Sequence, residues 1–507
     1  MNSKKPNILY MMCDQFRFDC IAALGNAKIS TPNLDRLVRR GISFDNAYSP
    51  CPVCVPARYT IRSGSEPYST GCYCNEEPQR PKGKEGEHVE EWTGPFLART
   101  LAANEYRTFG IGKFHTYPEV YEDVGFEVHL HTEEMWDDVG LKEKDAFYSY
   151  LAEEHPEFTY LEQLHGERTN MYYMPQLSSL PKEHTVEAFV ARKAVEQIEA
   201  QDTRPFFGFV SFIGPHPPCA PPIPYNRMYD PDGMDNPVVG PVEDDHLDEQ
   251  IPWMNSLIYA DEINDAWARN FKTRYYGEIS YIDSCIGSIL DAVEKLPDAD
   301  NTLICFFADH GDMCGDHHAW QKECFYEGSV RIPFLLSYPR MLGKNERNTN
   351  LVSLTDLFAL ATSVAGCKEV RDGIDILLDQ RKELFSYYGR PRSQQFKVML
   401  RWEEWKFIYM ANGGRQQLFN LSEDPLEMKN LVGRWPGLVD AMTKRVVQKF
   451  SQEEELRCMV SEGALVSYPF EARPLQRLHQ FDFSQDITDF SMGSGAHFMS
   501  EAVLLKK

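Results

Sequence analysis

Carboxyl, amide and imidazole side chains follow directly after two apolar segments of the sequence. Asp14 and Gln15 come after the segment NILYMMC. Asp309 and His310 come after the segment LICFFA, far along the chain. Carboxylate and amide oxygens are the ligands that Ca²⁺ and Mg²⁺ prefer, and a histidine nitrogen also suits Mn²⁺. The two pairs therefore predict a divalent metal site, provided that the fold brings them together.

Basic side chains follow two further apolar segments. Lys113 and His115 come after residues 108–112, and His216 comes after residues 206–213. A lysine ammonium beside a reacting anion neutralises its charge, and an imidazole accepts or donates a proton near neutral pH. A single histidine after a strand is more often a hydrogen-bonding residue than a catalyst. These residues become catalytic candidates only if they all meet at one place.

The string PCPVCVPARYTIRSG, residues 50–64, is the sharpest local pattern in the sequence. In one interpretation it is a turn with buried cysteines. In a second, Cys51, Cys54, Cys72 and Cys74 bind zinc, although the C-x-C spacing of the second pair is poor for a tetrahedral site. In a third, the C-x-P-x-R string from Cys54 to Arg58 is a catalytic motif.

The elements that must position these residues are apolar segments with the length of buried strands. They lack the in-and-out alternation of a sheet with one wet face, which is typical of parallel strands covered on both faces. The expected strands are residues 7–13, 108–112, 206–213, 303–308 and 333–338.

Helical patterns lie between these strands. One helix is expected to follow Thr31, with Pro32 at its first position and Gly41 just beyond its end. Another is expected over residues 271–296, where apolar residues recur on one face. Strands that alternate with helices predict a large, doubly wound, mostly parallel α/β sheet flanked by helices. In such sheets ligands bind at the carboxyl ends of the strands, so the reactive side chains are expected to share one edge of the sheet.

The chain divides into three predicted regions. Residues 1–375 are expected to form the catalytic α/β domain, and residues 376–450 a small antiparallel α+β subdomain built from LFSYY, FKVMLRW, WKFIYM, LFNL and a final helix. Residues 451–507 have no strong period and are expected to form an arm, which could mediate a homo-oligomer. Within the first region, residues 117–183 and 221–261 look like long insertions that cover the edge of the sheet.

Composition excludes several classes of protein. The 507 residues carry 52 Lys and Arg against 76 Asp and Glu, a net charge of −24, which argues against nucleic-acid binding and against a basic membrane-surface protein. The 13 cysteines have no regular spacing, as expected for a reducing compartment. No apolar stretch has the length of a membrane span, and no signal peptide is visible. We therefore expect a cytoplasmic location and no membrane partner.

Several motifs together resemble the type I, formylglycine-dependent sulfatases of the alkaline phosphatase superfamily. The C-x-P-x-R string at Cys54 is similar to their signature, and FGIGKFH to their second signature. FVSFIGPHPP, FFADHGDMCGDHHAWQK and LFNLSEDPLEMKNL also match, in the order of the family, and MMCDQF provides the first metal ligand. The matches extend from about residue 6 to residue 431.

The resemblance implies that Cys54 is converted to formylglycine by a formylglycine-generating or an anaerobic sulfatase-maturing enzyme. The family's usual ion is Ca²⁺, with Mg²⁺ or Mn²⁺ as alternatives. Its hydrated aldehyde attacks sulfur and later releases sulfate without a water nucleophile. The implied metal ligands are Asp14, Gln15, Asp309, His310 and the group at position 54. The implied catalytic residues are Cys54, Arg58, Lys113, His115, His216 and Lys322, and those expected to contact substrate are Lys113, His216, Lys322 and His317.

Within this family, Arg58 and Lys113 are expected to hold the nucleophile and the sulfate oxygens. His216 and Lys322 are expected to protonate the leaving oxygen, and His115 to take the proton that lets sulfate leave. The predicted function is hydrolysis of an organic sulfate monoester, with a sulfated carbohydrate as the expected substrate class and aryl sulfates as surrogates. The expected partner is accordingly a small-molecule or oligosaccharide sulfate ester.

The sequence departs from the family pattern at two places: the first keeps an alternative enzyme open, and the second bears on how efficiently Cys54 is converted to formylglycine. Gln15 replaces the second aspartate of many sulfatases, as in the branch that includes phosphonate monoester hydrolases. Arg62 and Ser63 also replace the usual residues before Gly64. A phosphonate monoester or phosphodiester hydrolase is therefore the alternative enzyme, although Lys113 favours a sulfatase. A pseudoenzyme that binds sulfated ligands is the alternative from another class.

Overall fold

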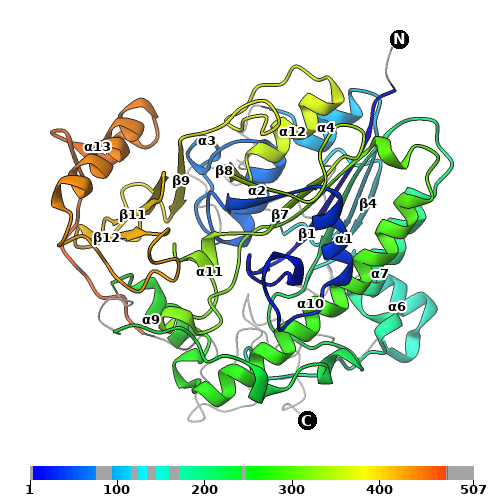
Figure 1. The fold of residues 1–507 in the computed structure, drawn as a ribbon, viewed down its shortest axis with the longest axis horizontal. Helices are drawn as coiled ribbons and strands as arrows, with labels where there is room; N and C mark the ends of the chain where they lie inside the picture. The colour runs from blue at the N-terminus through cyan, green and yellow to red at the C-terminus, as the bar shows by residue number, and fades with distance from the viewer. Residues whose placement is uncertain are drawn as a thin grey trace, which may run out of the picture.

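The computed structural model describes residues 4–75, 94–115, 124–133, 144–158, 171–241, 247–475 and 477. Its largest element is an eight-stranded, mostly parallel sheet that lies between two layers of helices (Figure 1). The strands, in their order across the sheet, are β4 (Val128–His131), β3 (Arg107–Gly112), β5 (Phe206–Phe212), β1 (Asn7–Cys13), β6 (Thr302–Ala308), β7 (Phe334–Ser337), β2 (Ile42–Tyr48) and β8 (Glu346–Ser353).

The sequence predicts the centre of this sheet well. Strands β3, β5, β1 and β6 are adjacent, parallel and almost wholly buried, as expected for apolar segments covered on both faces. The doubly wound α/β class is confirmed. The prediction that residues 333–338 form a parallel strand is wrong, because β7 runs antiparallel to both β6 and β2. A doubly buried strand reads as a continuous apolar run in either direction, so its composition does not encode its orientation. Strands β2, β4 and β8 were not predicted, and β4 lies within the segment 117–183 that was expected to be an insertion.

Helices pack on both faces of the sheet. On one face, helix α10 (Asp265–Glu294) contacts both α1 (Pro32–Arg40) and α7 (Val186–Ile198). Helices α2 (Cys54–Ser63), α4 (Leu97–Ala102) and α12 (Asp356–Ala365) contact one another on the other face, and Figure 1 shows the sheet between the two groups.

Two of these helices test the predicted boundaries. Helix α1 begins at Pro32 and ends before Gly41, as predicted. A Cβ atom on Gly41 would lie 2.0 Å from the carbonyl oxygen of Leu336, so only glycine fits where the chain turns into β2 against β7. Helix α10 begins six residues before the predicted start at residue 271, because the Asn264 side chain accepts a hydrogen bond from the Trp267 amide and caps the helix there.

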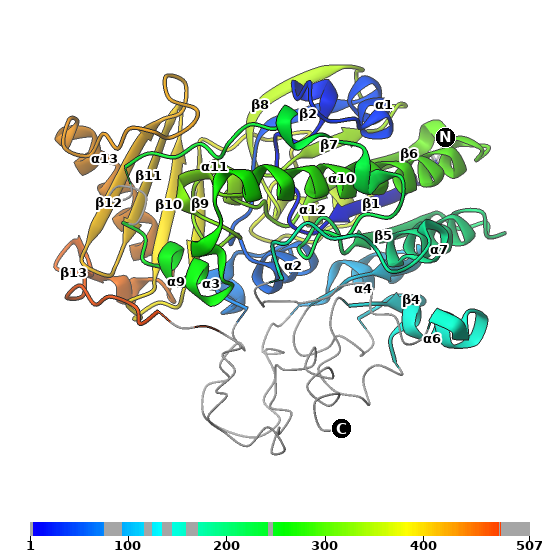
Figure 2. The ribbon, with the colours of Figure 1, turned by 90° about the horizontal axis from the view of Figure 1, so that it is seen from below.

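A second, antiparallel sheet lies at one end of the molecule (Figure 2). Its four strands and its helix α13 correspond to the segments from which the α+β subdomain was predicted. Gly413 and Gly414 have φ angles of 80° and 60°, so a left-handed turn joins the last two strands. In the order across the sheet the strands are β12 (Arg415–Asn420), β11 (Trp405–Met410), β10 (Lys397–Trp402) and β9 (Glu383–Tyr388), and α13 is Pro436–Gln452.

The two faces of the second sheet contact different parts of the molecule. On one face, Leu400 and Phe407 belong to an apolar core with Met442 and Phe450 of α13. On the opposite face, residues such as Met399 pack with residues 324–326 and 330 of the first region. This alternation along each strand is the period-two pattern of a sheet between two cores. The second sheet therefore contacts the segment that follows Lys322.

The described part of the predicted arm packs against the rest of the molecule. Leu456 and Met459 are buried in the core of the second sheet. Farther on, the guanidinium of Arg473 lies 3.2 Å from the centre of the Trp253 ring in helix α9 (Gln250–Leu257). Residues 478–507 lie outside the described residues, as do parts of the two predicted insertions. The predicted oligomer and the boundaries at residues 375 and 450 stay predictions. In the described part of the chain, none of the helices is both long enough and apolar enough to cross a membrane.

Candidate active site

The carboxyl ends of four adjacent strands bring the predicted reactive residues to one edge of the first sheet. Strand β1 ends before Asp14, β3 before Lys113, and β6 before Asp309. Because β3, β5, β1 and β6 are neighbours and run in the same direction, their carboxyl ends lie side by side. Helix α2 begins at Cys54 beside this edge.

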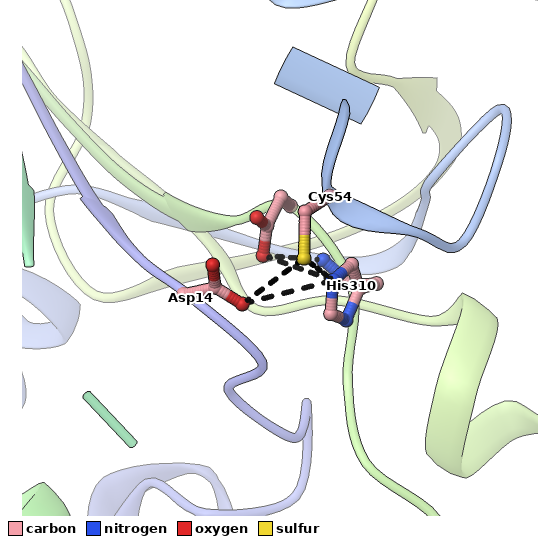
Figure 3. A group of neighbouring side chains, drawn as sticks. Asp14, Cys54 and His310 are labelled. Carbon is pink, nitrogen blue, oxygen red and sulfur yellow. Dashed lines mark hydrogen bonds and ion pairs between the residues drawn. The ribbon is translucent and has the colours of Figure 1, made fainter. Parts of the chain in front are cut away.

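Asp14, Cys54, Asp309 and His310 form a buried cluster in which one ligand atom from each lies within 4.8 Å of the others. Figure 3 shows the thiol of Cys54 directed between Asp14 and His310. Cys54 Sγ is 3.7 Å from Asp14 Oδ1 and 3.2 Å from His310 Nε2. His310 Nδ1 lies 3.0 Å from the carbonyl oxygen of Gly311, so Nδ1 carries the proton and Nε2 faces the cluster. Two carboxylates and an imidazole nitrogen fit a divalent cation, so the cluster can hold a metal.

Arg58 binds both carboxylates of the cluster. Its Nη2 donates to Asp14 Oδ2 at 2.9 Å, and its Nε donates to Asp309 Oδ2 at 2.8 Å. Its Nη1 donates to the Lys113 carbonyl at 2.6 Å. Arg58 follows Cys54 by four residues in α2, so the two side chains share one face of the helix. The C-x-x-x-R spacing therefore puts the guanidinium of Arg58 next to the thiol of Cys54.

Cations determine the ionisation of the cluster. Lys113 Nζ lies 2.6 Å from Asp14 Oδ2, and both side chains are fully buried. Burial raises the pKa of Asp14, but Lys113 and Arg58 outweigh it and hold this pKa well below its ordinary value. Burial also raises the pKa of the Cys54 thiol, and here Lys322 and His310 outweigh it, so this pKa lies well below its ordinary value. The site therefore stabilises negative charge at both positions.

Lys322 and Gln15 form the other side of the cluster. Lys322 Nζ donates to Gln15 Oε1 at 2.7 Å and to Cys54 Sγ at 3.2 Å. Gln15 Nε2 donates to Asp312 Oδ2, which also accepts from Tyr173 at 2.8 Å. Asp312 thus fixes the orientation of the Gln15 amide, with its oxygen toward Lys322. Tyr173 lies in the predicted insertion 117–183, and no local pattern distinguished it from the other aromatic residues there.

The three remaining histidines are held by other groups. His216 Nδ1 lies 2.7 Å from the Pro217 carbonyl oxygen, so its Nε2 is the nitrogen that the Tyr172 hydroxyl approaches, at 3.4 Å. The backbone amide of His115 donates to Glu133 at 2.5 Å.

His317 Nε2 lies 2.9 Å from the carbonyl oxygen of Leu426, and its ring stacks on Tyr326 at 3.9 Å. These contacts join His317 to the chain that follows the second sheet. The roles predicted for His115, His216 and His317 stay predictions.

The zinc interpretation of the cysteines does not agree with this geometry. Cys54 Sγ belongs to the cluster with Asp14, whereas Cys51 Sγ lies 3.4 Å from the Tyr73 carbonyl oxygen. Within the described ranges, the cluster at Cys54 is the one group of three or more such side chains that can hold a metal. Cys54 is therefore separated from the other three cysteines of that interpretation.

Two family models match the chain and define it as a hydrolase of the alkaline phosphatase superfamily. A family model described as "Sulfatase" matches residues 6–367, and one described as "N-sulphoglucosamine sulphohydrolase, C-terminal" matches residues 315–455. The chain belongs to the sulfatase family and is a sulfuric ester hydrolase.

Two sulfatases and one solved structure with the same fold are similar to this chain. An arylsulfatase of Clostridium perfringens is 27% identical over 89% of this chain and 95% of its own. A choline-sulfatase of Rhizobium meliloti is 26% identical over 94% of this chain and 95% of its own. The solved phosphonate monoester hydrolase of Agrobacterium radiobacter has the same fold, with a TM-score of 0.75 and 23% identity over 93% of this chain and all of its own.

Proposed function

We propose that this sulfatase hydrolyses a sulfate monoester of a carbohydrate, with Cys54 converted to formylglycine and Ca²⁺ as the bound cation. The position of Cys54 carries the proposal. Its Sγ lies 3.2 Å from His310 Nε2 and 3.2 Å from Lys322 Nζ, between a metal-type ligand and a proton donor. The match of residues 315–455 to the C-terminal model of N-sulphoglucosamine sulphohydrolase supports a sugar substrate.

In this proposal Asp14, Asp309, His310 and the group at position 54 hold the cation, with the Gln15 amide oxygen as a further ligand. The bound cation would neutralise the sulfate charge and favour ionisation of the attacking hydroxyl. Formylglycine would supply an aldehyde whose hydrate has two hydroxyls, one to attack sulfur and one to release sulfate. A maturing enzyme must oxidise Cys54 before turnover begins.

The protein's own side chains would handle charge and protons. Arg58 and Lys113 keep Asp14 ionised and add positive charge beside the nucleophile, where sulfate oxygens must bind. Lys322 donates to Cys54 Sγ, so its ammonium stands within reach of an oxygen that leaves from sulfur. His216 is the second candidate donor. His115 is the candidate base for release of sulfate.

The deciding experiment is the mass of the peptide that contains Cys54, after expression with a formylglycine-generating enzyme. We expect a loss of about 18 Da, the change from the thiol to the aldehyde whose hydrate is the nucleophile, together with hydrolysis of aryl and sugar sulfates. Undiminished sulfatase turnover by protein whose Cys54 remains a thiol would overturn the mechanism. A preference for phenyl phosphonate monoesters over sulfates would instead favour the phosphonate branch, which the relation to the Agrobacterium fold makes worth testing.

A further inference from the structure

Lys322 lies in a segment whose backbone is held in an uncommon conformation. Its neighbours Gln321 and Glu323 have φ angles of 75° and 73°, in the left-handed region that non-glycine residues rarely adopt. Such residues persist where surrounding contacts fix them. The contacts that fix this segment therefore also determine where the Lys322 ammonium lies.

Glu323 is fixed from two sides. Its backbone amide donates to the carbonyl oxygen of Pro52 at 3.1 Å, which joins it to the string that contains Cys54. Its carboxylate accepts from the Tyr388 hydroxyl at 2.8 Å and from the Gln250 amide at 2.5 Å. Its carbonyl oxygen accepts from Lys397 Nζ at 2.6 Å. Tyr388 and Lys397 belong to the second sheet, in β9 and β10.

These contacts are buried and costly to lose. Tyr388 is 6% exposed, Glu323 7% and Lys397 2%. Lys397 also forms an ion pair with Asp248 and lies 4.8 Å from the centre of the Tyr388 ring. A buried carboxylate needs hydrogen-bond donors, since each unsatisfied polar group costs free energy. The second sheet supplies one donor to the Glu323 carboxylate and one to its carbonyl oxygen.

We infer that Tyr388 and Lys397 are positioning residues, through which the second sheet holds Lys322 Nζ against Cys54 and Gln15. The inference rests on the proposed function, in which Lys322 protonates the leaving oxygen. Proton transfer requires the donor within hydrogen-bond reach of its acceptor, and a small displacement lowers the rate strongly. Loss of either contact releases the segment next to Lys322 without changing any group that touches substrate.

The test uses the matured enzyme and two aryl sulfates, 4-nitrophenyl sulfate and phenyl sulfate. Nitrophenolate leaves readily without a proton, whereas phenolate is a poorer leaving group. We expect Tyr388→Phe to lower kcat for phenyl sulfate about tenfold and kcat for 4-nitrophenyl sulfate less than about twofold, with KM unchanged. Lys397→Met should give the same pattern. Tyr388→Phe removes one hydroxyl, so it decides the question if Lys397→Met does not fold.

Tyr387→Phe is the matched control. Tyr387 precedes Tyr388 in β9 and is fully buried on the opposite face, where its hydroxyl has no hydrogen-bond partner among the described residues. It should leave the ratio of the two rates unchanged. An equal loss on both substrates in Tyr388→Phe, or the same change in Tyr387→Phe, would overturn the inference.

Lys322→Ala separates this inference from the proposed function. If Lys322→Ala slows phenyl sulfate far more than 4-nitrophenyl sulfate, Lys322 is the proton donor, and Tyr388→Phe then decides the positioning role. If Lys322→Ala slows both substrates equally, the proton-donor role fails, and positioning of a proton donor fails with it. The proposed sulfatase function would still stand in that case, provided that the Cys54 peptide carries the aldehyde.

Discussion

A buried basic side chain lies between two carboxylates at two places in the molecule. One is the edge of the first sheet, and the other is the second sheet. At the edge, Arg58 binds Asp14 and Asp309. In the second sheet, Lys406 Nζ lies 2.6 Å from Glu327 and 2.7 Å from Glu427. Lys406 and Arg58 are both buried.

The difference lies in what else the carboxylates face. Glu427 accepts from the backbone amide of Glu327, and Lys406 donates to the Phe325 carbonyl, so this group satisfies itself within the protein. Asp14, by contrast, also faces the thiol of Cys54. A buried group of ion pairs thus does not mark an active site. An active site is indicated when a candidate nucleophile and further metal-type ligands lie at the same place.

The largest effect on turnover should come from Cys54→Ala. We expect kcat/KM for 4-nitrophenyl sulfate to fall by about 10⁴-fold or more, the scale of removing a nucleophile, while the melting temperature stays close to that of the parent. Cys51→Ala is the matched control, since Cys51 is buried in the same string but bonds to the Tyr73 carbonyl. Near-parental turnover in Cys54→Ala would contradict the assignment of the nucleophile.

Arg58→Ala should damage both stability and turnover. It leaves Asp14 and Asp309 buried without their guanidinium, and breaking a buried ion pair costs about 3–5 kcal/mol. Because a cation next to the nucleophile is lost as well, we expect turnover to fall by about 10²-fold or more. Urea unfolding and steady-state kinetics measure the two effects. An exposed pair provides the control: Arg204 pairs with Glu127 and Asp202 at the surface, so Arg204→Ala should lower the unfolding free energy far less than Arg58→Ala. A fully active Arg58→Ala enzyme would refute the electrostatic role.

Metal binding should distinguish the two buried groups directly. If Ca²⁺ is the bound cation, as proposed, a free concentration of 100 times Kd should stabilise the folded protein by about 2.7 kcal/mol, measured as an increase in the unfolding free energy relative to chelator-treated protein. Asp309→Asn should abolish this gain because it removes a carboxylate ligand. Glu427→Gln, in the second group, should keep it. A gain that survives Asp309→Asn would place the cation elsewhere.

Much of the edge of the first sheet could be predicted from the sequence, because its residues follow strand ends in short motifs. Asp14 and Asp309 are each adjacent to an apolar run, and parallel strands bring such positions together wherever they lie in the chain. Cys54 and Arg58 share a helix face by their spacing alone. Local sequence patterns were therefore enough to predict both the fold class and the residues of the cluster.

The groups that hold these residues in place could not be predicted in this way. Tyr388 and Lys397 read as ordinary residues of an antiparallel strand, and their contact with Glu323 depends on how the second sheet packs on the first region. The predicted direction of β7 was wrong for the same reason, since the direction of a strand is determined by its pairing partners and not by its composition. Long-range packing leaves no short motif.

Lys406→Met should change stability while leaving catalysis almost intact. The substitution leaves Glu327 and Glu427 buried without their ammonium partner, so we expect a loss of about 3–5 kcal/mol in the unfolding free energy. Lys406 does not hydrogen-bond to either neighbour of Lys322. The rate ratio between phenyl and 4-nitrophenyl sulfate should therefore stay within about twofold, as expected for sites without shared partners. A change in this ratio as large as in Tyr388→Phe would mean that the whole second sheet, and not two of its residues, positions Lys322.

The smallest expected effect is a change in how stability depends on pH, at Glu66. Glu66 is buried near both regions, since its backbone amide donates to Asp372 and the neighbouring Tyr68 ring lies against Tyr387. Burial raises the pKa of Glu66 to about 8, and Arg381 opposes this only in part. The folded state then holds a proton that the unfolded state releases from about pH 4.5 upward. Stability should therefore fall as pH rises between these two values, by at most about 1.4 kcal/mol per pH unit.

Glu66→Gln should flatten this dependence and leave kcat unchanged, because the amide does not titrate and no group of the cluster contacts Glu66 among the hydrogen bonds of the described chain. Urea unfolding of both proteins from pH 5 to pH 9 measures the slopes. An identical slope in the two proteins would show that Glu66 is ionised in the folded state. A slope that differs while the kinetics do not would show that burial of this carboxyl affects the stability of the fold without serving the reaction.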